Sequence, residues 1–187
     1  GFGADTKWGN FHSVALGWKL ANENFTAGNN VASTLKLRVS YGRNGNQAVG
    51  AYETLSRLRE RSYLDGTMTA PGYVPSTLGN PSLGWEATTS FNVGLDYGFL
   101  GDRIQGTVDV FSATTEELLL EREISPIHGI TEITENIGQT RNTGFELGLM
   151  GEVLRAGDFT WNINGNIAVF RNEILELYGD AQDDVLN

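Results

Sequence analysis

Few side chains in this sequence have the type and spacing that covalent chemistry needs. His12 and His128 are the only histidines, and neither has a second histidine at metal-ligand spacing. No serine lies in a strand-turn-helix nucleophile setting, and no glycine-rich phosphate loop is followed by Lys-Ser or Lys-Thr. The chain has no cysteine, which excludes a thiolate zinc site and a cysteine nucleophile. We therefore expect no enzyme, no catalytic residue, no cofactor and no metal site; a barrel hydrolase with rim carboxylates and a histidine is the enzymatic alternative.

Carboxylates gather in two places. Asp180, Asp183 and Asp184 could offer oxygen ligands to Ca²⁺, but their spacing lacks the rest of a calcium loop, which favours a solvated loop. Residues 112–136 carry six glutamates against the single Arg122, so this segment is acidic. The charge either keeps an exposed loop soluble or forms a docking surface for a partner protein or divalent ions. The six are Glu116, Glu117, Glu121, Glu123, Glu132 and Glu135.

Two other groups are candidates for substrate binding. The first is a run of arginines at every second position, which on a strand would share one side and could attract an anionic substrate or pair with carboxylates. The second is a set of tyrosines in or beside the same region, because flat rings with a polar tip suit the faces of sugars. The arginines are Arg57, Arg59 and Arg61, and the tyrosines are Tyr52, Tyr63 and Tyr73.

The composition narrows the class of protein. A net charge of −10 argues against a nucleic-acid partner, since phosphate contacts need clustered Lys and Arg. With 24 Gly and 4 Pro the chain suits a turn-rich all-β fold. No apolar run is long enough for a transmembrane helix. Residues 1–25 lack the regions of a signal peptide, so we expect a mature form or a fragment.

The clearest structural signal is the alternation of residues 85–97. The odd positions from Trp85 to Tyr97 are mostly apolar and the even positions polar, which predicts a strand with one apolar face. After a break at 99–102 the pattern resumes in residues 104–110, which predicts a tight hairpin. The same alternation predicts strands at residues 11–20, 34–42, 145–149 and 159–169, with a break over 151–158.

The length of the strands and the rhythm of the connections favour a membrane barrel over a soluble sheet. Residues 85–97 would span roughly 30 Å along a tilted barrel strand. The connections alternate between short (21–33, 99–102, 151–158) and long (43–84, 113–143), as the periplasmic turns and extracellular loops of outer-membrane barrels do. We expect a short strand near residues 52–58. The residues predicted to face the membrane are Trp85, Phe91, Val93, Leu95, Tyr97, Trp161, Ile163 and Ile167.

The predicted fold class is an antiparallel transmembrane β-barrel, present as a partial segment of about 6–8 strands of a larger barrel, since an open edge in lipid leaves backbone groups unsatisfied. A soluble β-sandwich carbohydrate-binding or lectin-like module is the alternative from another class, in which the apolar phases would meet in a core. An adhesin or other structural surface protein is a third interpretation.

Five blocks of the sequence, in order, resemble one known family. They include Gly-Asn-Pro-x-Leu-x-Trp-Glu at 79–86 and Asn-Ile-Gly-x-x-x-Asn-x-Gly-Phe-Glu at 136–146. The sequence is similar to the C-terminal barrel half of SusC/RagA-type TonB-dependent transporters, over nearly the whole chain.

The resemblance implies a barrel of about 22 strands in the bacterial outer membrane, with residues 1–187 as part of the barrel domain and the plug domain absent. It implies active import of a large nutrient, an oligosaccharide or a peptide, by mechanical gating without covalent chemistry. The partners it implies are TonB, through the missing N-terminal region, a SusD-like surface lipoprotein, and outer-membrane lipid.

Overall fold

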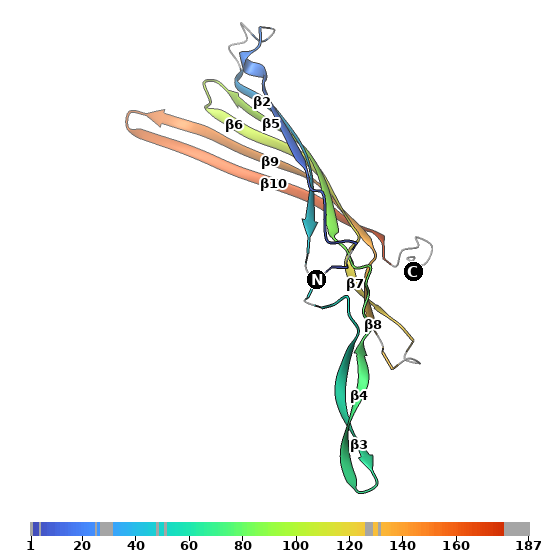
Figure 1. The fold of residues 1–187 in the computed structure, drawn as a ribbon. Helices are drawn as coiled ribbons and strands as arrows, with labels where there is room; N and C mark the ends of the chain where they lie inside the picture. The colour runs from blue at the N-terminus through green and yellow to red at the C-terminus, as the bar shows by residue number, and fades with distance from the viewer. Residues whose placement is uncertain are drawn as a thin grey trace.

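The chain forms one large antiparallel sheet from which two hairpins project (Figure 1). The computed structural model describes residues 2–3, 5–24, 26, 32–47, 49–50, 52–125, 129–130 and 132–177. The sheet has the strand order β1-β2-β5-β6-β9-β10. Its strands are β1 (Ser13–Lys19), β2 (Ala32–Asn46), β5 (Glu86–Phe99), β6 (Ile104–Glu116), β9 (Gln139–Ala156) and β10 (Phe159–Glu176), and the 3-10 turn η1 (Leu20–Asn22) follows β1. Five strands of 13–18 residues, the seven-residue β1 and an open sheet confirm the predicted partial barrel.

Both projecting hairpins arise from the two long connections. The first consists of β3 (Arg57–Asp65) and β4 (Met68–Thr77), and the second of β7 (Leu119–Glu123) and β8 (Glu132–Asn136). Figure 1 shows them beyond the same end of the sheet, where β2 ends and β5 begins, while the short connections lie at the other end. The predicted segregation of loop lengths is therefore confirmed.

Several predicted boundaries are wrong, because backbone pairing continues where the side-chain pattern stops. The region 43–84 is not an irregular loop, because β2 continues to Asn46 and the hairpin of β3 and β4 lies within it. The short strand expected near 52–58 is misplaced, since residues 52–55 form a turn and a bend and β3 begins only at Arg57. Likewise β6 extends to Glu116 and β9 begins at Gln139. The expected break over 151–158 is wrong too.

A β-bulge explains that last error. The register between β9 and β10 shifts between Trp161 and Asn162, whose partners are Leu154 and Glu152. Val153 is therefore an extra residue, and the adjacent apolar pair Val153-Leu154 breaks the period of two, while the strand itself continues to Ala156.

The short turn after β5 is held by side-chain hydrogen bonds. Leu100, Gly101 and Asp102 all have positive φ, which confirms the tight connection predicted at 99–102. The carboxylate of Asp102 accepts hydrogen bonds from the hydroxyls of Ser33 (2.6 Å) and Thr34 (3.0 Å). The turn is thereby tied to the start of β2.

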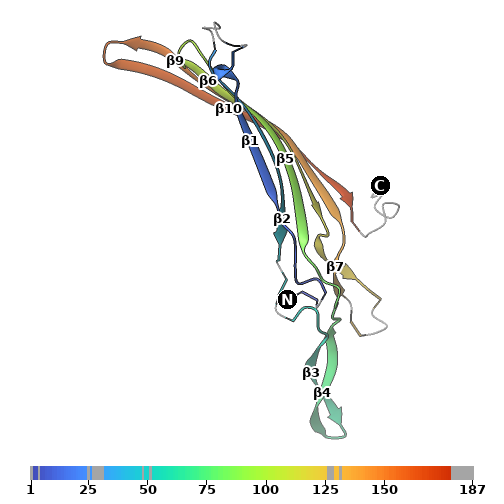
Figure 2. The ribbon, with the colours of Figure 1, turned by 45° about the horizontal axis from the view of Figure 1, so that its top comes forward.

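The sheet is curved and single-layered, with almost no interior of its own (Figure 2). Among the described residues the buried apolar side chains are Leu83, Ala87 and Ile130. No second sheet packs on the six-stranded sheet in this part of the chain, so the core that a β-sandwich requires is not present there. No described helix is long and apolar enough to cross a membrane.

Candidate functional site

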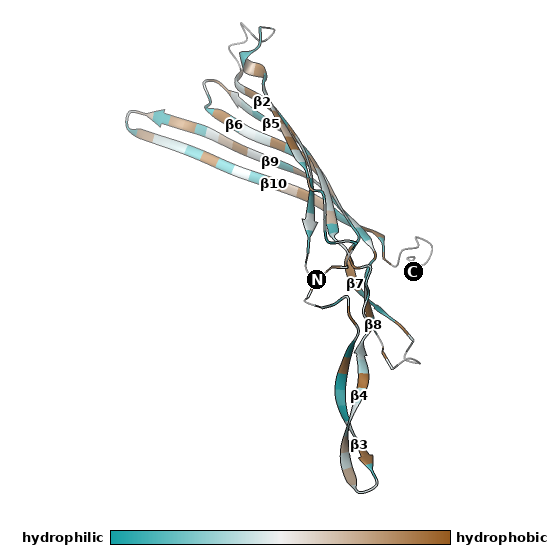
Figure 3. Ribbon diagram, in the orientation of Figure 1, coloured by the Kyte–Doolittle hydropathy of each residue, from teal (hydrophilic) through white to brown (hydrophobic). Residues whose placement is uncertain are grey.

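The register of the sheet aligns the apolar phases of all six strands on one face. One row across the sheet pairs residues that are all aliphatic or aromatic, and the next row repeats this composition. The first row is Trp18, Leu37, Leu95, Val108, Leu147 and Ile167; the second is Leu16, Val39, Val93, Val110, Phe145 and Val169. The alternation of brown and teal along the strands in Figure 3 follows from this pattern.

This apolar face is largely uncovered. Even on strands that are paired on both sides, its side chains are exposed to a degree that soluble sheets avoid, for example 48% for Phe91, 52% for Val110 and 49% for Leu149. An apolar face of this extent needs an apolar environment, because large contiguous apolar patches in water mark membrane or protein contact sites.

The apolar band also runs obliquely across the sheet. On β2 it extends from Leu35 to Tyr41, with its midpoint at Arg38, which registers through β5, β6 and β9 with Ala168 on β10. On β10 the band extends from Trp161 to Val169, with its midpoint at Gly165. The shift from Ala168 to Gly165 is about 10 Å over about 19 Å of sheet width, a slope of about 30°. Strands of membrane barrels tilt by about 35–45°, so an oblique band is the pattern expected if it lies level in a bilayer.

The predicted membrane-facing residues are distributed as follows. Phe91, Val93, Leu95 and Tyr97 lie on the apolar face of β5, and Ile163 and Ile167 share the apolar phase of β10 with Trp161. Trp85 lies one residue before β5, where its ring packs against Phe2 (centroids 4.7 Å apart) and Phe11 (5.1 Å). Contact with lipid remains a prediction for all eight.

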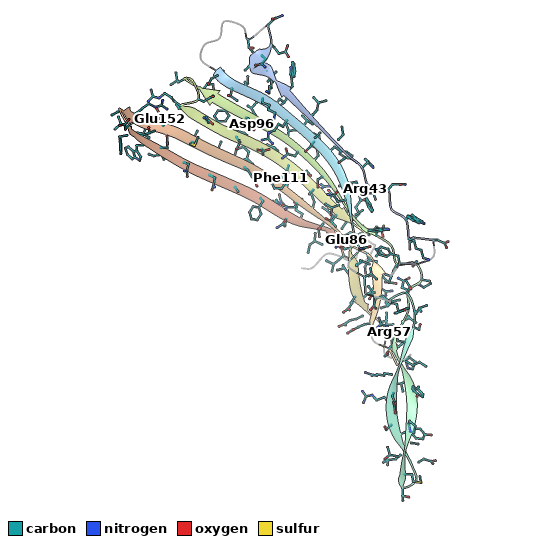
Figure 4. All side chains as sticks on the ribbon, turned by 60° about the vertical axis from the view of Figure 1, so that its left-hand side comes forward. Arg43, Arg57, Glu86, Asp96, Phe111 and Glu152 are labelled. Carbon is teal, nitrogen blue, oxygen red and sulfur yellow. The ribbon has the colours of Figure 1, made fainter. Side chains whose placement is uncertain are left out.

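The opposite face of the sheet is polar and carries an ion-pair cluster. Arg38 on β2 lies 2.8 Å from a carboxylate oxygen of Asp96 on β5 and 2.9 Å from one of Asp109 on β6. The arginine crosses over Gly94, where a Cβ atom would lie 2.4 Å from the Asp109 carboxylate and 2.7 Å from the guanidinium. Three strands are thus tied together on this face, and Figure 4 labels Asp96 there.

Two sequence motifs meet at the rim from which the hairpins project. Asn136 accepts a hydrogen bond from the backbone N–H of Gly84 (2.7 Å) and donates to the carbonyls of Gly84 (3.1 Å) and Glu117 (3.0 Å). Asn80 donates to the carbonyl of Thr134 (3.0 Å). Leu83, fully buried, lies between these asparagines in sequence. The segments 79–86 and 136–146 therefore act together as a rim clasp, formed by Asn80, Leu83, Gly84 and Asn136.

The N-terminal segment closes over the same rim clasp. The hydroxyl of Thr6 donates to the carbonyl of Leu83 (2.5 Å), and the backbone N–H of Gly3 donates to the same carbonyl (3.1 Å). Glu86 accepts a hydrogen bond from the amide of Asn46 (3.1 Å), which joins the end of β2 to the start of β5. His12, just before β1, lies with its ring 5.9 Å from that of Tyr41.

The hairpin β3–β4 carries most of the predicted substrate-binding residues but divides them. By its register, Tyr63 lies opposite Ala70 and on the same face as Arg59 and Arg61, whereas Tyr73 lies opposite Glu60 on the other face. Arg57 forms an ion pair with Glu53. Tyr52 precedes the hairpin, has positive φ and is 70% exposed. The arginines thus share one side of β3, while the three tyrosines are not gathered on one face.

The acidic segment 112–136 is partly neutralised by its own arginine. Arg122 on β7 lies 2.6 Å from Glu135 on β8, and a second guanidinium N–H donates to the other carboxylate oxygen at 3.1 Å. This bidentate hydrogen bonding lowers the pKa of Glu135 below its ordinary value. In the described parts of the chain, no three His, Cys, Asp or Glu side chains form a group that could hold a metal ion. His128, Asp180, Asp183 and Asp184 lie outside the described residues.

The lowered pKa predicts that the β7–β8 hairpin loosens in acid. A carboxylate with a lowered folded-state pKa stabilises the fold above its unfolded pKa, and this stability is lost as the pH falls through the folded value. The protection of β7–β8 amides against hydrogen exchange, corrected for intrinsic rates, should therefore be full near pH 7 and fall below about pH 4.5. Glu135→Gln should remove this dependence and Glu121→Gln, on an exposed side chain, should keep it. Equal protection at pH 7 and pH 3 in the unaltered protein would contradict the prediction.

Sequence reasoning missed the residues whose role depends on register. Arg38, Asp96 and Asp109 are polar-phase residues on three strands, and only the pairing brings them together. Phe111 and Phe170 were missed as well. They are aromatic residues at positions of β6 and β10 where the alternation calls for polar ones, and this exception to the pattern could have marked them as candidates for a functional role.

Comparisons with known proteins agree with this arrangement. The family model described as "TonB dependent receptor-like, beta-barrel" matches residues 1–185. The chain is 38% identical to the TonB-dependent receptor SusC of Bacteroides thetaiotaomicron, over 98% of this chain and 19% of that protein. It is 35% identical to a TonB-dependent receptor of Formosa agariphila, over 94% of this chain and 17% of that one. A solved structure of the RagAB peptide transporter superposes with a TM-score of 0.83 at 31% identity, over 95% of this chain and 19% of that chain. The chain therefore spans less than a fifth of the length of these relatives.

Proposed function

The chain belongs to the TonB-dependent receptor-like β-barrel family, and from this we propose that it forms six neighbouring membrane strands of a transporter for a large nutrient. Its SusC and RagAB relatives make it a SusC/RagA-type segment of a bacterial outer-membrane barrel. The cargo we propose is an oligosaccharide or a peptide. Import would be driven by TonB and assisted by a SusD-like surface lipoprotein, with residues 1–187 all belonging to the barrel domain.

The observation that carries this proposal is the pairing of an uncovered apolar face with a polar opposite face across all six strands. In a barrel wall the first faces lipid and the second lines the transport path. We propose no covalent chemistry for this segment, because transport by gating needs a wall and a path, and the relatives compared are receptors and transporters.

The projecting hairpins are the parts we assign to cargo and partner contacts. The exposed β3–β4 hairpin presents Arg59, Arg61 and Tyr63 on one face and Tyr73 on the other. Together with Arg57 and Tyr52 these residues support contact with cargo or with a surface lipoprotein.

A pair of neighbouring cysteine variants tests the placement of the sheet. Val93 lies on the apolar face and Asn92 on the polar face of β5. In the full-length protein in membranes, Val93→Cys should react with a lipid-phase thiol reagent only, and Asn92→Cys with a water-phase reagent only. Shielding of Val93→Cys from both reagents would mean that the apolar face is covered by protein, and would overturn the proposal.

A further inference from the structure

Two phenylalanines stand out on the polar face of the sheet. Phe111 on β6 and Phe170 on β10 both register with Gly144 on the strand between them, and Phe111 also registers with Asn92 on β5. Residues of this row share the face that carries Arg38 and Asp109, not the apolar face. Phe170 is 65% exposed. Contact with lipid therefore does not explain either ring.

Gly144 leaves room for the Phe111 ring over the middle strand. A Cβ atom at this position would lie 2.4 Å from Cζ and 2.6 Å from Cε1 of Phe111, so any larger residue here would force the ring to move. Because Gly144 leaves this space open, the ring covers β9 next to the strand that carries Phe170. Figure 4 labels Phe111 part-way along the sheet.

Uncharged amides with free hydrogen-bonding groups lie beside the two rings and on their rim-clasp side, whereas Asp109, Glu146 and Ala168 form the next row on the other side. Asn92 lies beside Phe111 in the same row, and Asn142 and Asn172 face each other one row closer to the rim clasp. Within the described residues, none of the three side-chain amides has a hydrogen-bond partner. Each amide offers both a donor and an acceptor. We call Phe111, Phe170, Asn92, Asn142 and Asn172 the aromatic–amide patch.

We propose that the aromatic–amide patch is a binding site for a neutral oligosaccharide. The C–H faces of a pyranose are apolar and can stack on an aromatic ring, and each hydroxyl needs a donor and an acceptor, which the amides supply. All five side chains are uncharged, so nothing in the patch selects a charged ligand. This inference rests on the proposed function, in which the polar face lines the transport path.

The backbone of the sheet argues against a peptide as the ligand of this patch. Extended peptides are commonly recognised by strand addition at an unpaired sheet edge. β5, β6 and β9 are paired on both sides, so beside Phe111 the patch offers side chains only. The place of the aromatic–amide patch in the sheet also suits a ligand that enters from the end with the projecting hairpins. The Phe111 row lies at the end of the apolar band nearest those hairpins.

The test uses the full-length protein that contains this chain, purified in detergent. Binding of neutral hexasaccharides of the α-1,4-glucan, β-1,3-glucan, mannan and xylan types and of an uncharged decapeptide is measured by calorimetry. Phe111→Ala and Phe170→Ala should each weaken binding of the recognised oligosaccharide about 10-fold. Phe111→Trp should restore it. Phe91→Ala removes a ring of the same size from the apolar face and should leave the affinity unchanged.

Folding is checked for each variant by heat-modifiable migration in detergent gels. If an alanine variant does not fold, Asn142→Ala and Asn172→Ala replace it and should also weaken binding. The site is overturned if no neutral hexasaccharide binds the unaltered protein, or if folded phenylalanine variants bind as tightly as the unaltered protein. If the phenylalanine variants lose binding of the decapeptide and keep binding of the hexasaccharide, the assignment to carbohydrate is overturned.

Uptake of the same oligosaccharide, by cells with and without TonB, separates this inference from the proposed function. Binding through the patch without TonB-dependent uptake would contradict the transporter and leave the site standing. TonB-dependent uptake with unchanged affinity in the phenylalanine variants would contradict the site and leave the transporter standing.

Discussion

Val108→Arg is expected to lower the free energy of unfolding of the full-length barrel in vesicles by about 2–4 kcal/mol, the effect of a lipid-facing arginine near the bilayer midplane. Val108 lies in the first of the two rows in which every residue across the six strands is apolar. A guanidinium there would have to enter hydrocarbon or distort the bilayer to reach water. The measurement is denaturant unfolding followed by tryptophan fluorescence.

Thr107→Arg is the matched control for this experiment. Thr107 precedes Val108, lies on the polar face and pairs with Asp96 on β5, so an arginine there meets water and a carboxylate. Its unfolding free energy should change little. Equal destabilisation by both variants would contradict a lipid-facing apolar face and a water-facing polar face.

The second large effect is expected at the rim clasp. Asn136→Ala removes three hydrogen bonds to the backbone of Gly84 and Glu117 and leaves those backbone groups without partners. At about 1 kcal/mol per hydrogen bond, the clasp should lose about 2–3 kcal/mol of local stability. The Gly84 amide and the β7–β8 amides should then exchange faster with solvent by at least tenfold, while the amides of β6 and β9 keep their protection.

Asn44→Ala provides the comparison, because Asn44 is an exposed asparagine with no side-chain hydrogen bond among the described residues. It should leave the exchange of all these amides unchanged. If Asn136→Ala behaves in the same way, the contact between the two motifs does not hold the rim together.

The sequence alone predicts the faces of this sheet well, because a period of two survives wherever one face must be apolar. Val93 and Asn92 could be assigned to opposite faces before any pairing was known. The tight turn at Leu100 to Asp102 was also predictable from its composition and its position between two alternating segments.

What the sequence could not supply is register between strands that are far apart in the chain. Arg38 meets Asp109 and Phe111 meets Gly144 only because β2, β5, β6 and β9 are aligned in one particular way. The end of β9 was predicted too early for a related reason. The extra residue Val153 breaks the alternation of side chains, but the backbone pairing continues beyond it. The hairpin β3–β4 was hidden because both of its faces mix charged, aromatic and aliphatic residues.

The hydrogen bond between Asn46 and Glu86 has a consequence for how such proteins diversify. Asn46 and Glu86 are also backbone partners, so the pairing of β2 with β5 already places the two ends of the connecting segment side by side. A change in the length of this segment therefore does not alter the register of the sheet. The entropic cost of closing a flexible loop rises slowly with its length, by about 0.6 kcal/mol for each doubling. Insertions and deletions in the part of this connection outside the rim clasp, such as the β3–β4 hairpin, should therefore cost little folding free energy, and natural selection can remodel the projecting hairpin while the paired strands are inherited almost unchanged.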